Sequence, residues 1–405
     1  MSKILKFESF LSSKIFTHKR YKKSISSPII KISTLSISIS IIVMIIAIST
    51  GFGIQNEIKS KFSNVFGDLS IDRYDNDLYN SENYIVSDAI KVNSIKSMEN
   101  LKSIDPVIYS PVISPNNNSF DDIILKGINE DNYIFKTKLL SNKINNIGLN
   151  EVIISKKLSK KLELQLKDNL MVFYYQNQSL PKIRNLKVIG FYETGISEFD
   201  SKVVLTNINQ LRSLKNINNN QIGSYELHFY DYKKIDLENL EKYVPPNYAL
   251  NFNNEKFSEI YNWVSLFDLN VYLIIVLMIV IGAINMITAL LVTILEKTSL
   301  IGFLKIIGSN NNSIERVFLN NGLSLIFKGL VWGNLISILI IFVQKFFQVF
   351  KLNADTYYID YVPVEINLIQ ILLLNLITIF ICYVFLIIPV KIISKIKPYS
   401  SLRMN

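Results

Sequence analysis

The sequence predicts a membrane protein with four transmembrane helices and one large α+β domain between the first and second helices. The first observation is its apolar composition: 49% of the 405 residues are hydrophobic and the mean hydropathy is +0.27. This is high, but too low for a wholly embedded chain, so embedded and water-exposed parts must alternate. The second is a set of four apolar stretches of about 20 residues or more, the length that crosses a bilayer. They cover residues 32–51, 269–295, 318–343 and 366–390.

Basic residues are unevenly distributed, which predicts how the chain is oriented. The first 31 residues contain eight Lys and Arg against one acidic residue, segment 296–316 adds three, and the tail 391–405 adds four. Lys and Arg in short loops stay on the cytoplasmic side. Both termini and segment 296–316 are therefore expected in the cytoplasm.

The segment expected outside, residues 53–265, is nearly neutral, with 25 Lys and Arg against 26 Asp and Glu. The net charge of +10 therefore belongs to the cytoplasmic flanks. It indicates topology and contact with anionic lipid heads rather than nucleic-acid binding, since no basic patch with interleaved aromatics stands out.

The predicted organisation runs as follows: a basic cytoplasmic segment with an interfacial helix (1–31), helix 1 (32–52), the outer α+β domain (53–265), helix 2 (266–295), a cytoplasmic helix and loop (296–316), helix 3 (317–344), an outer loop (345–365), helix 4 (366–390) and a cytoplasmic tail (391–405). Two alternatives stay open. The N-terminal segment could be a plain basic leader, in which the helical spacing of apolar residues arises by chance, rather than an interfacial helix. The first apolar stretch, which ends near Ala47 and Ser49, could be a cleaved signal. The long preceding segment and long apolar run favour an uncleaved anchor.

The outer domain mixes strand and helix patterns, which is typical of an α+β domain. Short segments rich in β-branched and aromatic residues predict strands at 123–126, 152–154, 170–175, 186–191, 203–205 and 225–230. Apolar residues three or four apart predict helices at 87–101, 156–164 and 207–215.

Sites for chemistry are missing from the sequence. No GxxxxGK[ST] loop and no GxSxG elbow occurs, and the only cysteine, Cys382, lies in the fourth apolar stretch. The two histidines, His18 and His228, fall on opposite sides of the membrane in the predicted topology. No catalytic residue, metal site or bound cofactor is therefore predicted for this chain.

Charges are scarce in the apolar stretches, although Lys328 interrupts the third, and this disfavours an ion or solute pathway. Small and polar residues recur there instead: Ser33, Ser36 and Ser40 follow one face of the first stretch, and Asn285 and Thr288 lie in the second. They suit close helix packing and interhelical hydrogen bonds, or the lining of a lateral cavity for a lipid-bearing substrate.

Residues 296–308, EKTSLIGFLKIIG, follow the second apolar stretch and are too short and too charged to span. Leu300, Ile301, Leu304 and Ile307 repeat at helical spacing, and Gly308 suits a helix C-terminus. The sequence therefore predicts a short amphipathic helix at the cytoplasmic membrane surface, where a partner could dock.

The chain resembles the lipoprotein-releasing permeases, part of a wider group of ABC transporter permeases that includes the macrolide exporters and the cell-division permease. Similar motifs occur in the family's order: STGF followed by EI (49–58), NEVIISKKLSKKLELQLKDNLMVF (150–173), GFYETGISEFDSKVVL (190–205), ADTYYIDYVPVEI (354–366) and KIKPYSSLR (395–403). Together they cover nearly the whole chain.

The resemblance implies that the outer domain is periplasmic and similar to that of the macrolide exporters (MacB-like). It implies a permease of the bacterial inner membrane that extracts acylated lipoproteins and passes them to a periplasmic carrier. A separate ATPase dimer would bind ATP and Mg²⁺, and a second permease subunit, identical or diverged, would complete the complex with membrane lipids around it. One alternative function is drug or peptide efflux, which the YYID loop disfavours. Another is a scaffold that activates a peptidoglycan hydrolase, which the large size of the outer domain disfavours.

The resemblance also implies three sets of site residues. Contacts to the ATPase are expected from Glu296, Leu300, Ile301, Leu304, Lys305 and Gly308. A hook that grips the carrier is expected at 174–184, with Tyr174, Tyr175, Pro181 and Arg184. Acyl-chain contacts are expected from Met44, Ile48, Ile275 and Met278. For the apolar ATPase contacts and the acyl-chain contacts, packing within the chain is the competing interpretation; for the hook it is an ordinary hairpin.

Overall fold

A computed structural model describes residues 26–395, except for 75–78, 81–82, 117–118, 141–143 and 176–179. The described residues form two compact units. The spanning unit comprises 26–55, 265–350 and 362–395, and the α+β unit comprises 56–264 and 351–361, so the chain passes between them four times. Most of the predicted interfacial helix, with His18, lies outside the described residues.

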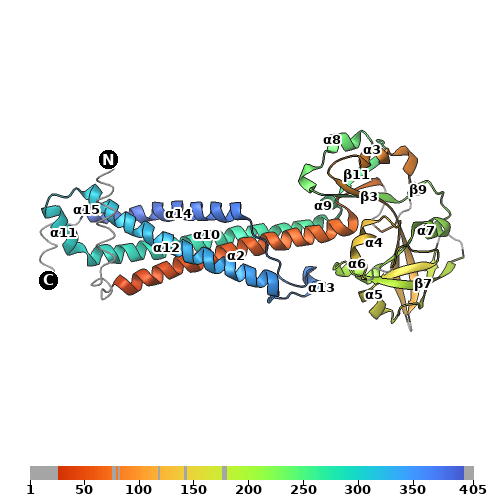
Figure 1. Ribbon diagram of the computed structural model, residues 1–405, viewed down its shortest axis with the longest axis horizontal. Coiled ribbons are helices and arrows are strands. Elements are labelled where there is room, and N and C mark those ends of the chain that lie inside the picture. The colour runs from red at the N-terminus through yellow and green to blue at the C-terminus, as the bar shows by residue number, and fades with distance from the viewer. Residues whose placement is uncertain are drawn as a thin grey trace. The chain divides into compact units, whose positions relative to one another are not determined.

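Four long helices form the spanning unit (Figure 1). They are α2 (Ser26–Phe66), α10 (Ser258–Glu296), α12 (Asn311–Phe347) and α14 (Leu368–Val390). Each is long and apolar enough to cross a membrane. The prediction of four apolar helices is therefore confirmed. Two short helices, α11 (Thr298–Ile306) and α15 (Ile392–Lys395), accompany them.

Three of these helices are much longer than the predicted spans. Helices α2, α10 and α12 contain 41, 39 and 37 residues. At 1.5 Å per residue each measures about 55 to 60 Å, against about 30 Å for the hydrocarbon core. Hydropathy finds the apolar part of a helix and cannot show where its polar continuation ends.

Glycines on α12 allow close contact with α2. A Cβ on Gly329 would meet the side chain of Ile37 at 2.6 Å, and one on Gly333 would meet Ile41 at 2.7 Å. Small residues at helix crossings let backbones approach closely, which favours association in lipid. Ile37 and Ile41 belong to the buried core of this unit.

Hydrogen bonds between spans add to this packing. The side-chain amide of Asn285 donates to Ser36 Oγ, and Ser33 Oγ donates to the backbone carbonyl of Asn285 at 3.2 Å. These bonds join α2 to α10, as the sequence predicted for Asn285. Thr288 instead donates to Ile284 of its own helix. Asn334 and Asn375 exchange two bonds of 3.0 Å and so join α12 to α14.

The α+β unit is built on a nine-stranded sheet in the order β11-β1-β10-β3-β4-β8-β5-β7-β6. Its strands are β1 (Leu69–Arg73), β3 (Leu101–Asn116), β4 (Ser119–Ile128), β5 (Glu151–Ser155), β6 (Asn169–Tyr174), β7 (Lys182–Tyr192), β8 (Val203–Asn207), β10 (Ser224–Phe229) and β11 (Tyr248–Phe252). Strand β6 also pairs with β3, at Phe173 and Ile113, so the six strands from β3 to β6 close on themselves. A second sheet pairs β2 (Ile85–Val86) with β9 (Gln221–Ile222).

Short helices connect these strands. They are η2 (Ser87–Ala89), α3 (Val92–Lys96), α4 (Tyr133–Lys138), α5 (Lys156–Lys161), α6 (Ser197–Lys202), α7 (Ile208–Lys215), η3 (Tyr232–Lys234), α8 (Leu237–Glu241), α9 (Asn253–Lys256) and, in the loop 351–361, α13 (Ala354–Tyr357). Pairings β4–β8 and β5–β7 are parallel, and the other pairings of the large sheet are antiparallel.

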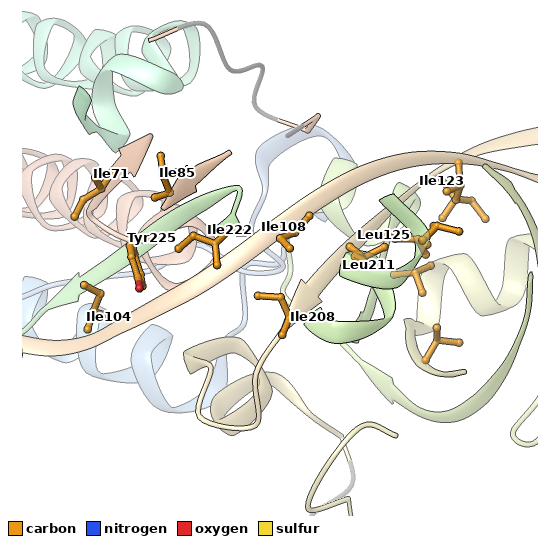
Figure 2. Close-up of a cluster of buried hydrophobic side chains, with 14 of the residues drawn as sticks. Ile71, Ile85, Ile104, Ile108, Ile123, Leu125, Ile208, Leu211, Ile222 and Tyr225 are labelled. Atoms are coloured by element: carbon orange, nitrogen blue, oxygen red, sulfur yellow. The ribbon is translucent and has the colours of Figure 1, made fainter. Parts of the chain in front are cut away.

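The core of the α+β unit is a continuous cluster of mainly aliphatic side chains, with Tyr225 among them (Figure 2). Ile108 and Leu125 from the sheet and Leu211 from α7 are each at most 1% exposed. Burial of this apolar surface is the main favourable term in folding.

All six predicted strands are present. The predicted helix at 87–101 is largely wrong, because this stretch forms only η2 and α3 before β3 begins at Leu101. The sequence did not predict strands β1, β2, β3, β9 and β11.

Candidate functional site

The segment after the second span forms its own short helix. Helix α10 ends at Glu296 and α11 runs from Thr298 to Ile306, with Lys297 at φ −95° and ψ 16° between them. Glu296 therefore belongs to the end of the long helix, where its carboxylate lies 3.3 Å from Lys297 Nζ.

Gly308 closes α11 with a two-bond motif. Its φ is +91°, its N–H donates to the Lys305 carbonyl at 3.1 Å, and Ser309 N–H donates to the Leu304 carbonyl at 3.0 Å. This is the Schellman arrangement, which glycine adopts without Cβ strain. The helix ends where the sequence predicted, and the motif fixes the direction in which the chain leaves it.

The predicted docking face of α11 points largely into its own unit. Ile301 is fully buried in the core of the spanning unit, and Leu304 packs against that core. Leu300 is half-buried. Other helices of this unit cover the Ile301 side chain, so packing within the chain, the competing interpretation, accounts for its burial.

Other apolar side chains of this segment are exposed. Phe303, Ile306 and Ile307 are 54%, 55% and 60% exposed. Helical periodicity predicted one apolar face at Leu300, Ile301, Leu304 and Ile307, but Ile307 of that face is exposed and the segment is apolar on both sides. The sequence signal that could have found the outer face is Phe303, a large aromatic at i+3 from Leu300.

Lys305 is held within the chain. Its Nζ donates to the Ile393 carbonyl at 2.7 Å, in the short helix α15. Burial lowers the pKa of this lysine, and Glu315 opposes the shift. Lys305 therefore ties α11 to the C-terminal helix, so the expected role as a polar contact to a partner has a competing bond.

The predicted hook coincides with the hairpin of β6 and β7, in which Tyr174 pairs with Lys182. Tyr174 is only 7% exposed and belongs to the core of the unit, so it is not an accessible contact. Pro181 and Arg184 are half-buried, and residues 176–179 lie outside the described residues.

Exposed apolar side chains gather on this hairpin. Tyr175 and Leu180 are 60% and 89% exposed, and Ile183 is 51% exposed. Of these only Tyr175 was predicted as a contact. Leu180 directly precedes Pro181 and Ile183 follows it by two residues, and these apolar residues close to the proline were the signal available.

The predicted acyl-chain contacts lie in the core of the spanning unit. Met44 is fully buried and Ile48 is 9% exposed, while Ile275 and Met278 are half-buried against the same core. Packing accounts for Met44 within this chain.

An unpredicted polar cluster lies inside the α+β unit. Lys126 is fully buried, and its Nζ lies 2.8 Å from a Glu226 carboxylate oxygen and 2.9 Å from the Val65 carbonyl in the last turn of α2. Tyr109 donates to the same carboxylate at 2.8 Å. Burial lowers the pKa of Lys126, while Glu226 acts in the opposite direction. Each member has partners, which buried charges require.

A second polar cluster lies within the motif GFYETGISEFD (190–200). The Asp200 carboxylate accepts bonds from Thr194 N–H, Thr194 Oγ and Gly195 N–H, which closes the turn before α6. Burial raises the pKa of Asp200, although these bonds partly lower it. A pocket beside the turn is lined by Lys61, Lys157, Glu193, Thr194, Gly195, Ser197, Asp200 and Asp360. Among the described residues, no three His, Cys, Asp or Glu gather closely enough to hold a metal ion.

The sequence matches one protein-family model and several known proteins. Residues 272–398 match the family model described as FtsX-like permease C-terminal. The chain is 25% identical to the lipoprotein-releasing system transmembrane protein LolC of Buchnera aphidicola subsp. Schizaphis graminum, covering 93% of this chain and 94% of that protein. It is 21% identical to LolE of Haemophilus influenzae, covering 74% and 76%.

Among solved structures, the periplasmic region of MacB from Actinobacillus actinomycetemcomitans is similar, with 16% identity and a TM-score of 0.32. That match covers 48% of this chain and 92% of the MacB region.

Proposed function

We propose that this chain, which is similar to LolC and LolE and matches the FtsX-like permease family model at residues 272–398, releases acylated lipoproteins from the inner membrane. In this proposal a periplasmic carrier receives them, and a separate cytoplasmic ATPase supplies the energy. The permease itself is not an enzyme. Both termini face the cytoplasm and the α+β unit faces the periplasm, in keeping with the positions of Lys and Arg.

The observation that carries the proposal is the exposed apolar side of α11. Phe303, Ile306 and Ile307 are more than half exposed on a helix that is anchored on its other side by buried Ile301 and by Lys305. An apolar surface on a rigid helix suits docking of another protein, because little conformational freedom is lost on binding.

The carrier would bind the β6–β7 hairpin. Tyr175, Leu180 and Ile183 present apolar surface there, and large exposed apolar side chains that gather at one place indicate an interaction site. A second permease subunit, either a copy of this chain or a diverged one, would complete the membrane complex.

Depletion of the protein tests the cellular role. The proposal predicts that lipoproteins destined for the outer membrane accumulate in the inner membrane. Purification in mild detergent should at the same time recover an ATPase and bound acylated protein. Normal lipoprotein sorting after depletion would contradict the function, and absence of an ATPase would contradict the source of energy.

Variants in α11 test the docking surface. Phe303→Asp together with Ile306→Asp should weaken ATPase binding by about 10- to 100-fold, since charges are placed against an apolar contact. Tyr230→Asp, at an exposed tyrosine of the α+β unit, is the matched control and should leave binding unchanged. If the double variant and the control bind the ATPase equally well, α11 is not the docking site.

A further inference from the structure

The loop between α12 and α14 belongs to a different unit from the helices it connects. Phe350 and Val362 are in the spanning unit, whereas residues 351–361 are in the α+β unit. Any movement of α12 or α14 relative to the α+β unit therefore acts on this short loop.

The loop is closed at its base. Lys351 and Tyr361 form an antiparallel bridge, and Leu352 N–H donates to the Asp360 carbonyl at 2.9 Å. Between them, Ile359 is only 2% exposed, and Tyr358 has φ +59°, an uncommon conformation for a residue with a side chain. Such a conformation persists only where surrounding contacts determine it.

Those contacts come from the ends of two long helices. Lys61 Nζ of α2 donates to the Tyr358 carbonyl at 2.9 Å. The Tyr358 ring meets Phe62 of α2 edge-on at 5.8 Å between centroids, and Trp263 of α10 at 6.4 Å. The loop is thus held by one charged hydrogen bond and by two aromatic contacts.

Lys61 also contacts the turn of the GFYETGISEFD motif. A Cβ on Gly195, whose φ is +77°, would lie 2.7 Å from Lys61 Nζ, so the glycine leaves room for the lysine. Lys61 and Asp360 line the same pocket with Thr194, Gly195 and Asp200. Lys61 therefore lies where α2, this turn and the loop 351–361 meet.

We infer that residues 351–361 are a latch that fastens the α12–α14 connection to the end of α2, and that Lys61 is the positioning residue that keeps it closed. A pull on the loop from α12 or α14 then moves α2 and the motif turn together. The inference rests on the proposed function, because it identifies where movement of the spans reaches the α+β unit.

Hydrogen exchange on the full-length protein in detergent tests whether the latch exists. Lys61→Met keeps the aliphatic stem but removes the donor, so amides bonded within the loop, such as those of Leu352 and Tyr357, should exchange about 10- to 100-fold faster. Lys61→Arg should restore slow exchange. Lys59→Met, on the same helix, is the control and should leave the loop unchanged. Unchanged exchange in Lys61→Met would overturn the latch.

Coupling is tested in the purified complex with its ATPase, by measuring lipoprotein released per ATP hydrolysed. Lys61→Met should lower this ratio several-fold while ATPase binding stays at the wild-type level, and Lys61→Arg should recover it. A wild-type ratio despite faster loop exchange would overturn the coupling role. Absence of release by the wild-type complex would instead contradict the proposed function, and loop exchange would still decide whether the latch exists.

Discussion

The spanning unit and the α+β unit use opposite arrangements of polar and apolar groups. Large apolar side chains such as Leu269, Trp332 and Phe380 are more than half exposed on the spanning helices, and amide pairs such as Asn334 and Asn375 lie between them. In the α+β unit, aliphatic side chains form the interior, and a charged pair is buried with them. In lipid, close backbone packing and hydrogen-bonded polar groups stabilise the fold, whereas in water the burial of apolar surface stabilises it.

The comparison predicts the largest effect for breaking the buried pair of the α+β unit. Lys126→Met leaves Glu226 with a buried charge that has lost its cation, so the unit should lose about 3 to 5 kcal/mol of stability. Pulse proteolysis of the full-length protein in urea measures this loss. The double variant Lys126→Met with Glu226→Gln should recover much of it. Equal losses in the single and double variants would show that the charge is not the cause.

A smaller effect concerns two other buried groups of that unit, Asp105 and His228, whose Oδ2 and Nε2 atoms lie 3.5 Å apart. Burial raises the pKa of Asp105 to about 6 and lowers the pKa of His228 to about 3. From about pH 4 to 6 the folded state holds a proton on Asp105 that the unfolded chain has lost, so this group lowers stability as pH rises. His228 has the opposite sign, because the unfolded chain holds its proton up to about pH 6.5. The two slopes offset each other.

Single variants separate these slopes. Relative to wild type, Asp105→Asn should gain about 1.4 kcal/mol of stability per pH unit between about pH 4 and 6, and His228→Gln should lose a similar amount. Pulse proteolysis across this pH range provides the measurement. Parallel pH profiles for both variants and the wild type would exclude the assigned protonation states.

In the spanning unit the expected effects come from close packing. Gly333→Ala places a Cβ 2.7 Å from Ile41 and 3.0 Å from the Ser38 carbonyl, so the helices must separate, at a cost of about 1 to 3 kcal/mol. Gly282→Ala is the matched control, since its nearest contact would be an ordinary 3.6 Å from Ser40. Thermal unfolding in detergent compares the two, and equal midpoints would argue against a close crossing of α2 and α12.

The smallest effect is expected for a hydrogen bond between spans. Asn285→Leu removes the donor to Ser36 and should cost about 0.6 kcal/mol, with about 1.7 kcal/mol as an upper bound, because polar groups in unfolded spans also find partners. Thr288→Val is the control, since Thr288 bonds only within its own helix among the described contacts. A loss for Asn285→Leu as large as that for Lys126→Met would contradict the contrast between the two units.

The sequence predicted those features that depend on local pattern. Apolar length identified the four spanning helices, and β-branched segments identified β4, β5 and β8. It missed β3, because Pro106, Pro111 and Pro115 interrupt the usual strand signal. In the structure β3 pairs with β10 over its first half and with β4 over its second, a division that local sequence does not reveal.

The candidate sites show the same limit. Periodicity predicted a helix near residues 298–306, but both of its sides are apolar, so only tertiary contacts could show that Ile301 faces inward and Phe303 outward. No local pattern distinguishes Lys126 from the other lysines of the sequence, and its partner Glu226 is 100 residues away. The contact of Lys61 with Tyr358 spans 297 residues. Long-range partners of single charges are not encoded in a local pattern.

Reconstitution tests the central claim most directly. The permease complex and its ATPase are placed in liposomes with a labelled acylated lipoprotein, and a soluble periplasmic carrier is added outside. The proposed function predicts ATP-dependent transfer of the lipoprotein to the carrier, lost in the Phe303→Asp, Ile306→Asp variant. Full ATP hydrolysis by the bound ATPase, with the lipoprotein remaining in the membrane, would contradict it.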